Sequence, residues 1–497
     1  MKNAKIYLFL ALSGFFAASC NDAIDIKQDG ELVPEKAFET VGDLNTGLLG
    51  VYSLVPAEGY IYFTSVFTDE TAIGASNGGQ GVDLLLHNIT AQSGTASGVW
   101  SGNYRLINNA TRIIKAAENI TYDESTESER LKHIVAQAYA LRAFGHLQLM
   151  SAFTTDMKNP NALSVIKLDF IPSINDKLPR NTVSEVVDLI LSDLDFAYDN
   201  LSTNAQLAPG ATYIRKSFIP AIKARLYAYT GQYGLAEQFA DQTISTSGTT
   251  LSAGITYQNI WRDLDAGEVI FKLERNASSV SGANFYQYWS SANSTVTGSP
   301  MLEVNRALFN LVNSSTDIRK NVIADVTSII NPNYAALSVD EYRTTDIIPV
   351  GKYSASKGIN LLGDVKVIRL SEIYFIKAEA RVAAGDLTGA AQAVFDVRSK
   401  RITGATMPVY NNATEAWADI LKERRVELAF EGHRLLDIKR LGSLAGVTID
   451  RDPQDCSAQG FPCDLPVTDY RFTLPIPASE INVNPSIRNQ QNPGYAN

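Results

Sequence analysis

The strongest constraint on the fold is a five-position pattern that occurs twice in helix-forming segments. In each copy an alanine is followed three, seven, nine and twelve positions later by a large side chain, a glycine, a second large side chain and an alanine. The copies are Ala224, Tyr227, Gly231, Tyr233 and Ala236, then Ala378, Arg381, Gly385, Leu387 and Ala390. The glycine is expected to end a first helix in a left-handed cap. The alanines would let a second helix pack closely against it.

This pattern resembles the tetratricopeptide signature, in which each repeat is a helix-turn-helix unit. Such pairs bury their apolar faces only by stacking, so at least three units are expected. The sequence therefore predicts a mainly α protein whose tetratricopeptide-like helix-turn-helix repeats form one body. Chance similarity between alanine-rich helices is the alternative.

Apolar side chains at helical spacing extend this prediction along the chain. Helices are expected at residues 99–117, 128–153, 182–200, 217–230, 235–246, 370–384, 388–401 and 414–440. Residues 21–45 are expected to form an extended leader.

A long central segment departs from the helical pattern. Residues 247–365 are rich in Ser, Thr, Asn and Gly, and only residues 302–312 keep helical periodicity. Long loop-rich segments in compact proteins are usually functional. The predicted organisation is a signal at residues 1–19, a helical region at 20–246, a loop-rich ligand-binding insertion at 247–365 and a C-terminal region at 366–497.

The N-terminus has the features of an export signal. Lys2 and Lys5 are followed by the apolar run from Ile6 to Phe16, which is too short to span about 30 Å of hydrocarbon. Small residues then lead to Cys20, and this arrangement resembles a bacterial lipoprotein signal in which Cys20 becomes the lipidated first residue. Ala17 departs from the leucine usual in such signals. A buried N-terminal helix is the alternative.

Export would place the other two cysteines, Cys456 and Cys463, in an oxidising compartment. A disulfide between them would close a small loop and stabilise the protein by roughly 2.5 kcal/mol. A zinc site is a weaker alternative, because no histidine lies nearby and two thiolates leave the metal shell incomplete.

Composition excludes several classes of partner and cofactor. The net charge is −10 and only 19% of residues are charged, so attraction to nucleic acid is not expected. The four histidines are scattered, and the sequence has no phosphate-binding or dinucleotide-binding glycine motif. We therefore expect no cofactor and no metal site. The abundant uncharged polar residues suit a neutral ligand.

Two patterns could indicate catalysis, and both are weak. Residues 74–78 match the spacing of a nucleophile elbow but lack the flanking strand and helix. Glu427 and Glu431 stand one helical turn apart like a glycosidase pair. Opposite charges three residues apart, from Glu431 through Arg434 and Asp437 to Arg440, favour a structural helix held by ion pairs. We predict no catalytic residues.

Aromatic residues in polar surroundings are the better functional candidates. Flat rings can lie against the CH face of a sugar, and side-chain amides can bond its hydroxyls. The candidate ligand-binding residues are Tyr60, Tyr62, Asn77, Gln80, Trp100, Tyr286, Tyr288 and Trp289. Core packing is an equal alternative for each aromatic residue, and Trp100 is the most ambiguous because it begins a helix.

Several segments, in this order and after a lipoprotein signal, resemble the SusD/RagB family of outer-membrane nutrient-binding lipoproteins of Bacteroidota. They are residues 141–143, 223–227, 369–374, 378–380, 423–440, 474–480 and 491–495. The resemblance covers nearly the whole chain. The family's ligand contacts vary, so none is assigned to a position here.

The resemblance implies a cell-surface protein, lipid-anchored in the outer membrane, that is not an enzyme. It would bind an oligosaccharide or polysaccharide and deliver it to a partner SusC-type TonB-dependent transporter. A peptide-binding lid of the same family is the main alternative. A glycoside hydrolase and a pure interaction scaffold are the others.

Overall fold

The structure is a computed structural model that describes residues 38–275 and 298–496. Its helices are α2 (Val41–Ser53), α3 (Ala57–Phe67), α4 (Val82–Leu85), α5 (Gly94–Ala117), α6 (Glu124–Phe153), α7 (Val183–Asn200), α8 (Phe218–Tyr229), α9 (Tyr233–Thr246), α10 (Gly254–Ile260), α11 (Arg306–Val312), α12 (Lys320–Ile323), α13 (Val339–Thr345), α14 (Leu370–Ala383), α15 (Leu387–Arg401), α16 (Ala413–Glu427), α17 (Arg434–Ala445) and α18 (Ala478–Val483).

The strands are short and form two-stranded antiparallel sheets. They are β1 (Thr71–Ile73) with β3 (Leu302–Val304), β2 (Val269–Leu273) with β6 (Val365–Arg369), and β4 (Ala355–Ser356) with β5 (Ile359–Asn360). The first two sheets join segments that are far apart in the sequence. The protein is therefore mainly α, as predicted, and its strands act as local ties between helices.

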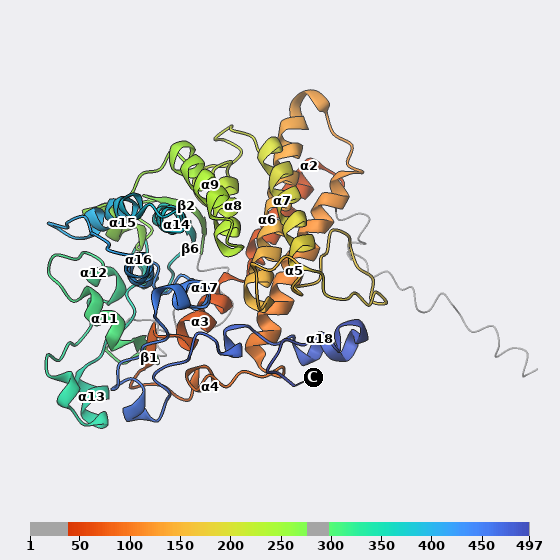
Figure 1. Ribbon diagram of the computed structural model, residues 1–497. Coiled ribbons are helices and arrows are strands. Elements are labelled where there is room, and N and C mark those ends of the chain that lie inside the picture. Colours follow the sequence, from red (N-terminus) through yellow and green to blue (C-terminus); the bar gives the residue numbers. More distant parts are fainter. Residues whose placement is uncertain (1–37, 276–297, 497) are drawn as a thin grey trace, which may run out of the picture.

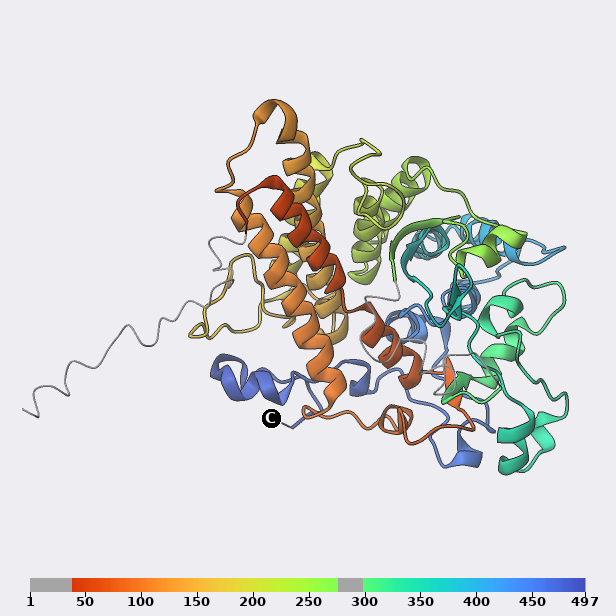
Figure 2. The same cartoon turned by 180° about the vertical axis from the view of Figure 1, so that it is seen from behind.

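Stacked helix pairs form one part of the molecule (Figure 1). The pairs α8–α9, α14–α15 and α16–α17 each pack internally, and α14 also contacts both α9 and α16. This arrangement confirms the predicted tetratricopeptide-like body and gives it three stacked units. The longer helices α5, α6 and α7 pack in succession beside it, with α2 lying against α5 and α6 (Figure 2).

The repeat glycines have the predicted left-handed conformation. Gly231 has φ +74° at the end of α8, and Gly385 has φ +80° at the end of α14. Their backbone N–H groups bond to carbonyls of the last helical turn, those of Ala228 and Val382. The sequence signal is local, because only glycine adopts this conformation without steric cost.

The prediction of a single helix at residues 414–440 is wrong, because two helices occupy this segment. α16 ends at Glu427, α17 begins at Arg434, and Phe430 has φ +62° between them. Tertiary hydrogen bonds stabilise the break: Lys352 donates to the Glu427 carbonyl over 2.9 Å, and the Tyr353 hydroxyl donates to the Phe430 carbonyl over 3.1 Å. These partners come from a distant segment, so helical periodicity could not reveal the break.

The ion pairs expected within that helix are mostly replaced by long-range pairs. Only Asp437 and Arg440 pair as predicted, at 3.0 Å. Arg434 bonds to Asp69, and Glu431 accepts from Lys352 and Arg369. The helix break redirects Glu431, and burial next to other elements gives each charge a partner outside its own helix.

Two boundaries also differ from expectation. Helix α2 begins at Val41, inside the expected leader, because Thr40 and Asp43 form a capping box at its N-terminus. The helical pattern expected at residues 302–312 is divided into strand β3 and helix α11. Asn305 separates them and caps α11 by accepting from the Ala307 N–H at 3.0 Å.

Candidate functional site

Helix α3 carries two of the predicted ligand-binding residues on different sides. Tyr60 faces inward, where its ring lies 6.3 Å from that of Phe63 and lines a cavity of about 60 Å³ together with Arg225 and His433. Burial raises the pKa of Tyr60. Tyr62 lies toward the loop that follows β1, since a Cβ built on Gly81 would sit 3.0 Å from its hydroxyl oxygen.

The loop of residues 74–81 lies against residues 299–301 of the insertion. The Gly74 N–H donates to the Met301 carbonyl over 3.0 Å, and the Ser76 N–H donates to the Pro300 carbonyl over 3.1 Å. A Cβ on Gly74 would collide with the Pro300 carbonyl oxygen, so only glycine allows this approach. The β1–β3 pairing therefore continues into the 74–81 loop.

The predicted amides Asn77 and Gln80 shape this loop. Asn77 Nδ2 donates to the Met301 carbonyl over 2.8 Å, and Asn77 Oδ1 accepts from the Gly79 N–H over 2.8 Å. Gln80 Oε1 accepts from the Gly78 N–H over 2.6 Å. Residues 75, 76, 78 and 79 are exposed, so the amides hold a rigid turn that presents polar backbone to the surface.

Tyr286, Tyr288 and Trp289 lie outside the described residues, as does Cys20. The chain on either side of the aromatic segment is described. Arg275 forms an ion pair with Glu58 of α3. On the far side, Ser299 bonds to Ser76, and Pro300 and Met301 bond to the 74–81 loop. The structure thus brings Tyr62, Asn77 and Gln80 together with the 299–301 flank, while the Arg275 flank lies against Glu58, one helical turn before Tyr62.

Trp100 occupies a different place. It is 4% exposed, its Nε1 donates to Glu480 over 3.2 Å, and its ring lies 4.9 Å from those of Tyr104 and Phe153. With Tyr104 and Glu480 it lines a separate groove of about 550 Å³ between α5, α18 and the segment before α7. The structure therefore does not bring Trp100 together with the other candidates.

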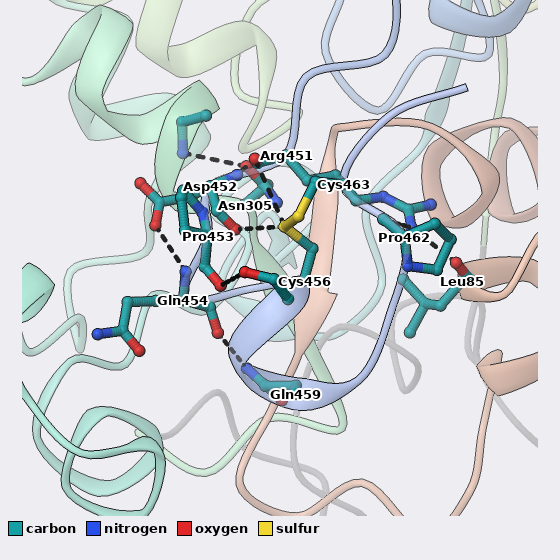
Figure 3. The surroundings of a disulfide bond; sticks show 12 residues. Leu85, Asn305, Arg451, Asp452, Pro453, Gln454, Cys456, Gln459, Pro462 and Cys463 are labelled. Atoms are coloured by element: carbon teal, nitrogen blue, oxygen red, sulfur yellow. Dashed lines mark hydrogen bonds between the residues drawn. A yellow bond between two sulfur atoms is a disulfide. The ribbon is translucent and has the colours of Figure 1, made fainter. Parts of the chain in front are cut away.

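Cys456 and Cys463 form a disulfide that lies beside Arg451 (Figure 3). The closed loop holds Arg451, whose guanidinium donates to the carbonyls of Phe67, Thr68 and Leu85. These carbonyls lie on both sides of the 74–81 loop along the chain. Sequence reasoning missed Arg451, because nothing local distinguishes it from a surface arginine.

The carboxylates of the proposed glycosidase pair belong to a buried ion-pair network. Glu427 accepts from Arg369 at 2.8 Å and from Arg401 at 2.9 Å, while Glu431 accepts from Arg369 and Lys352. Burial raises the pKa of Glu431, but Arg369 and Lys352 outweigh it and the pKa is lowered. Burial also raises the pKa of Glu427, but Arg401 and Arg369 outweigh it and the pKa is lowered. Neither carboxylate is suited to donate a proton as a general acid.

Stacked helix pairs with a loop-bearing insertion against α3 define a tetratricopeptide-like scaffold protein. Two family models match the chain: one described as the SusD family over residues 285–495, and one described as "Starch-binding associating with outer membrane" over residues 24–227. The chain belongs to the SusD/RagB family, as the sequence motifs predicted.

A relative agrees with this assignment over most of the chain, and solved structures share the fold. A SusD-like protein of Formosa agariphila is 24% identical over 90% of this chain and 95% of its own length. A SusD superfamily protein from Bacteroides thetaiotaomicron has a TM-score of 0.76, 24% identity, and coverage of 91% of this chain and 100% of that one. A structure titled a putative sugar binding protein from Bacteroides vulgatus has a TM-score of 0.74, 24% identity, and coverage of 93% and 100%.

Within the part of the chain that the structure describes, no helix combines the length and the apolar character needed to cross a membrane.

Proposed function

We propose that the protein binds an oligosaccharide or polysaccharide at the cell surface and delivers it to a SusC-type TonB-dependent transporter. In this proposal Cys20 carries the lipid that anchors the protein in the outer membrane. Membership of the SusD/RagB family supports the proposal, and so do the signal at residues 1–19 and the similarity to a protein titled as sugar binding.

The single observation that carries the binding site is the convergence on α3. Glu58 holds one flank of the aromatic segment, and the 74–81 loop holds the other. We propose that Tyr62 and the exposed backbone of the 74–81 loop contact the glycan, together with Tyr286, Tyr288 and Trp289. Aromatic rings would lie against the apolar face of a sugar ring, while backbone polar groups bond its hydroxyls.

We propose that the protein binds the glycan without cleaving it. The carboxylate pair that the sequence offered for catalysis is bound by arginines and held ionised in the interior. A hydrolase of this kind needs one carboxyl group that carries a proton near neutral pH. Incubation with a bound oligosaccharide should therefore yield no shorter product, and the appearance of fragments would contradict this part of the proposal.

A Trp289→Ala variant tests the site on a glycan array of neutral oligosaccharides. Loss of a ring contact of roughly 1.4 kcal/mol should weaken binding about tenfold, with no change in melting temperature. Val409→Ser is the matched control, because Val409 is 84% exposed and has no role in the proposed site. Unchanged binding with a sharply lower melting temperature would make Trp289 a core residue and place the site elsewhere.

A further inference from the structure

Arg451 is buried between the chain segments that precede and follow the 74–81 loop, with 2% of its surface exposed. Its Nη2 donates to the Phe67 carbonyl over 2.8 Å and its Nε to the Thr68 carbonyl over 2.9 Å. Its Nη1 donates to the Leu85 carbonyl over 2.7 Å. One guanidinium therefore joins the end of α3 to the end of α4. The 74–81 loop is contained in the chain between those two points.

The partners of Arg451 are backbone carbonyl groups and the His87 ring, whose Nε2 lies 3.1 Å from the Arg451 Nη2. Among the described residues no carboxylate forms an ion pair with it, and burial lowers its pKa to about 10. The carbonyls of Phe67 and Thr68 lie at the C-terminus of α3, where the helix dipole is negative and favours a cation. Only arginine offers five N–H donors in a fixed planar fork, so it can bind several carbonyls at once.

The disulfide loop contacts Arg451 directly (Figure 3). The Arg451 backbone N–H donates to the Cys463 carbonyl over 3.0 Å, and its Nη1 donates to the Pro462 carbonyl over 3.0 Å. Cys463 is joined to Cys456, which is fully buried. A continuous set of contacts thus leads from the disulfide through Pro462 and Cys463 to Arg451, and from Arg451 to the end of α3 and the end of α4.

We propose that Arg451 is the positioning residue of the 74–81 loop and that the Cys456–Cys463 disulfide holds Arg451 in place. The relevance of this loop to ligand binding rests on the proposed function. The positioning itself rests only on the contacts above. Reduction adds two electrons and two protons to the disulfide and gives two thiols. Reduction removes the covalent link between Cys463 and Cys456. The carbonyls of Pro462 and Cys463 are then no longer held in place to accept hydrogen bonds from Arg451.

The test compares amide hydrogen exchange in the mature protein before and after reduction by a water-soluble phosphine. One phosphine and one water convert the disulfide to two thiols and a phosphine oxide. Exchange across residues 69–86 should accelerate at least about tenfold, because the opening free energy of that segment falls. Exchange in α14 and α15 should stay unchanged. Uniform acceleration over the whole chain, or none in residues 69–86, would overturn the proposal.

Variants separate positioning from general stability. Cys456→Ser with Cys463→Ser should reproduce the effect of reduction without a reductant. Arg451→Met should accelerate exchange in residues 69–86 further, and Arg451→Lys should restore part of the protection, because an ammonium has three donors. Leu421→Ala is the control, since Leu421 is buried in a separate cluster around α16. It should lower the melting temperature without selective exchange in residues 69–86. Equal exchange patterns in Arg451→Lys and Arg451→Met would exclude positioning by the fork.

The exchange measurement needs no ligand, so its failure is distinct from failure of the proposed function. Repeating the glycan array with oxidised and reduced protein connects the two. If the oxidised protein binds a glycan and reduction weakens its affinity at least about fivefold, the result supports the role of the loop. A change of about fivefold is the equivalent of one hydrogen bond. Equal binding by both forms, with faster exchange in residues 69–86, would show that the glycan site does not depend on this loop.

Discussion

At the residue scale, the interior contains ionisable groups whose protonation depends on their surroundings. Glu70 is fully buried and accepts from the Ser65 hydroxyl over 2.6 Å and from the Phe430 N–H over 3.2 Å. Burial raises the pKa of Glu70 to about 7, although these hydrogen bonds oppose the shift. The same helix break that contains Phe430 therefore contacts a carboxyl group that changes charge near neutral pH.

Glu70 makes folding stability depend on pH with a definite sign. A carboxyl group with a raised pKa in the folded state binds more protons there than in the unfolded state, so its contribution is fully present below about pH 4.5 and is lost as pH rises through about 7. Glu70→Gln should remove this loss. We compare the unfolding free energies of the variant and the native protein. The value for the variant minus the value for the native protein should increase by up to about 3 kcal/mol from pH 4.5 to pH 8. Urea unfolding at both pH values measures it, and a constant difference would contradict the assignment.

Two of the predicted binding residues, Asn77 and Gln80, also have roles that local chemistry explains. Asn77 precedes a glycine, and an Asn-Gly pair is a turn signal. Asn77 and Gln80 indeed bond the loop backbone. The sequence predicts these amides as ligand contacts, and that role stays a prediction. The approach of the loop to Met301 was not predictable, because residues more than two hundred positions apart meet there.

At the element scale, glycines at helix ends and inside helices have opposite roles. Gly385 has φ +80° and an open space where a Cβ would lie, so a side chain there meets backbone strain alone. Gly50 lies inside α2 with equally open space and no positive φ. The comparison isolates backbone conformation from packing.

We expect Gly385→Ala to lower the free energy of unfolding by about 1 kcal/mol, because the left-handed conformation penalises a Cβ. Gly50→Ala should raise it by roughly 0.5–1 kcal/mol, because alanine loses less entropy in a helix. Chemical denaturation of both variants provides the measurement. Two changes of the same sign would show that Gly385 is not a required helix stop.

Helices were predictable at this scale where their signals are local. The seven helices expected before residue 402 are present, with ends that shift by a few residues. The break between α16 and α17 was not predictable, because it depends on Lys352 and Tyr353 binding the freed carbonyls.

At the scale of the whole molecule, a buried charge network joins the insertion to the helical body. Arg369 at the end of β6 bonds to Glu268 at 2.7 Å, to Glu427 at 2.8 Å and to Glu431 at 2.8 Å. Arg401 of α15 also bonds to Glu268 and Glu427. Removing one charge from such a network leaves others buried without a partner.

We therefore expect Arg369→Met to lower the free energy of unfolding by about 3–5 kcal/mol. Arg105→Met is the matched control, because Arg105 is exposed on α5 and its change should stay within about 0.5 kcal/mol. Thermal and urea unfolding of both variants test this. A loss below about 1 kcal/mol for Arg369→Met would mean that the network does not hold the two regions together.

Sequence alone was enough to predict the helical repeats, the glycine caps and the family. Each of these depends on spacing or on local backbone chemistry, which periodicity records directly. The tertiary structure decided which charges pair, where the last long helix breaks, and how Arg451 joins the end of α3 to the end of α4. Such contacts join residues hundreds of positions apart, and their energy depends on burial, which arises only when the chain is packed.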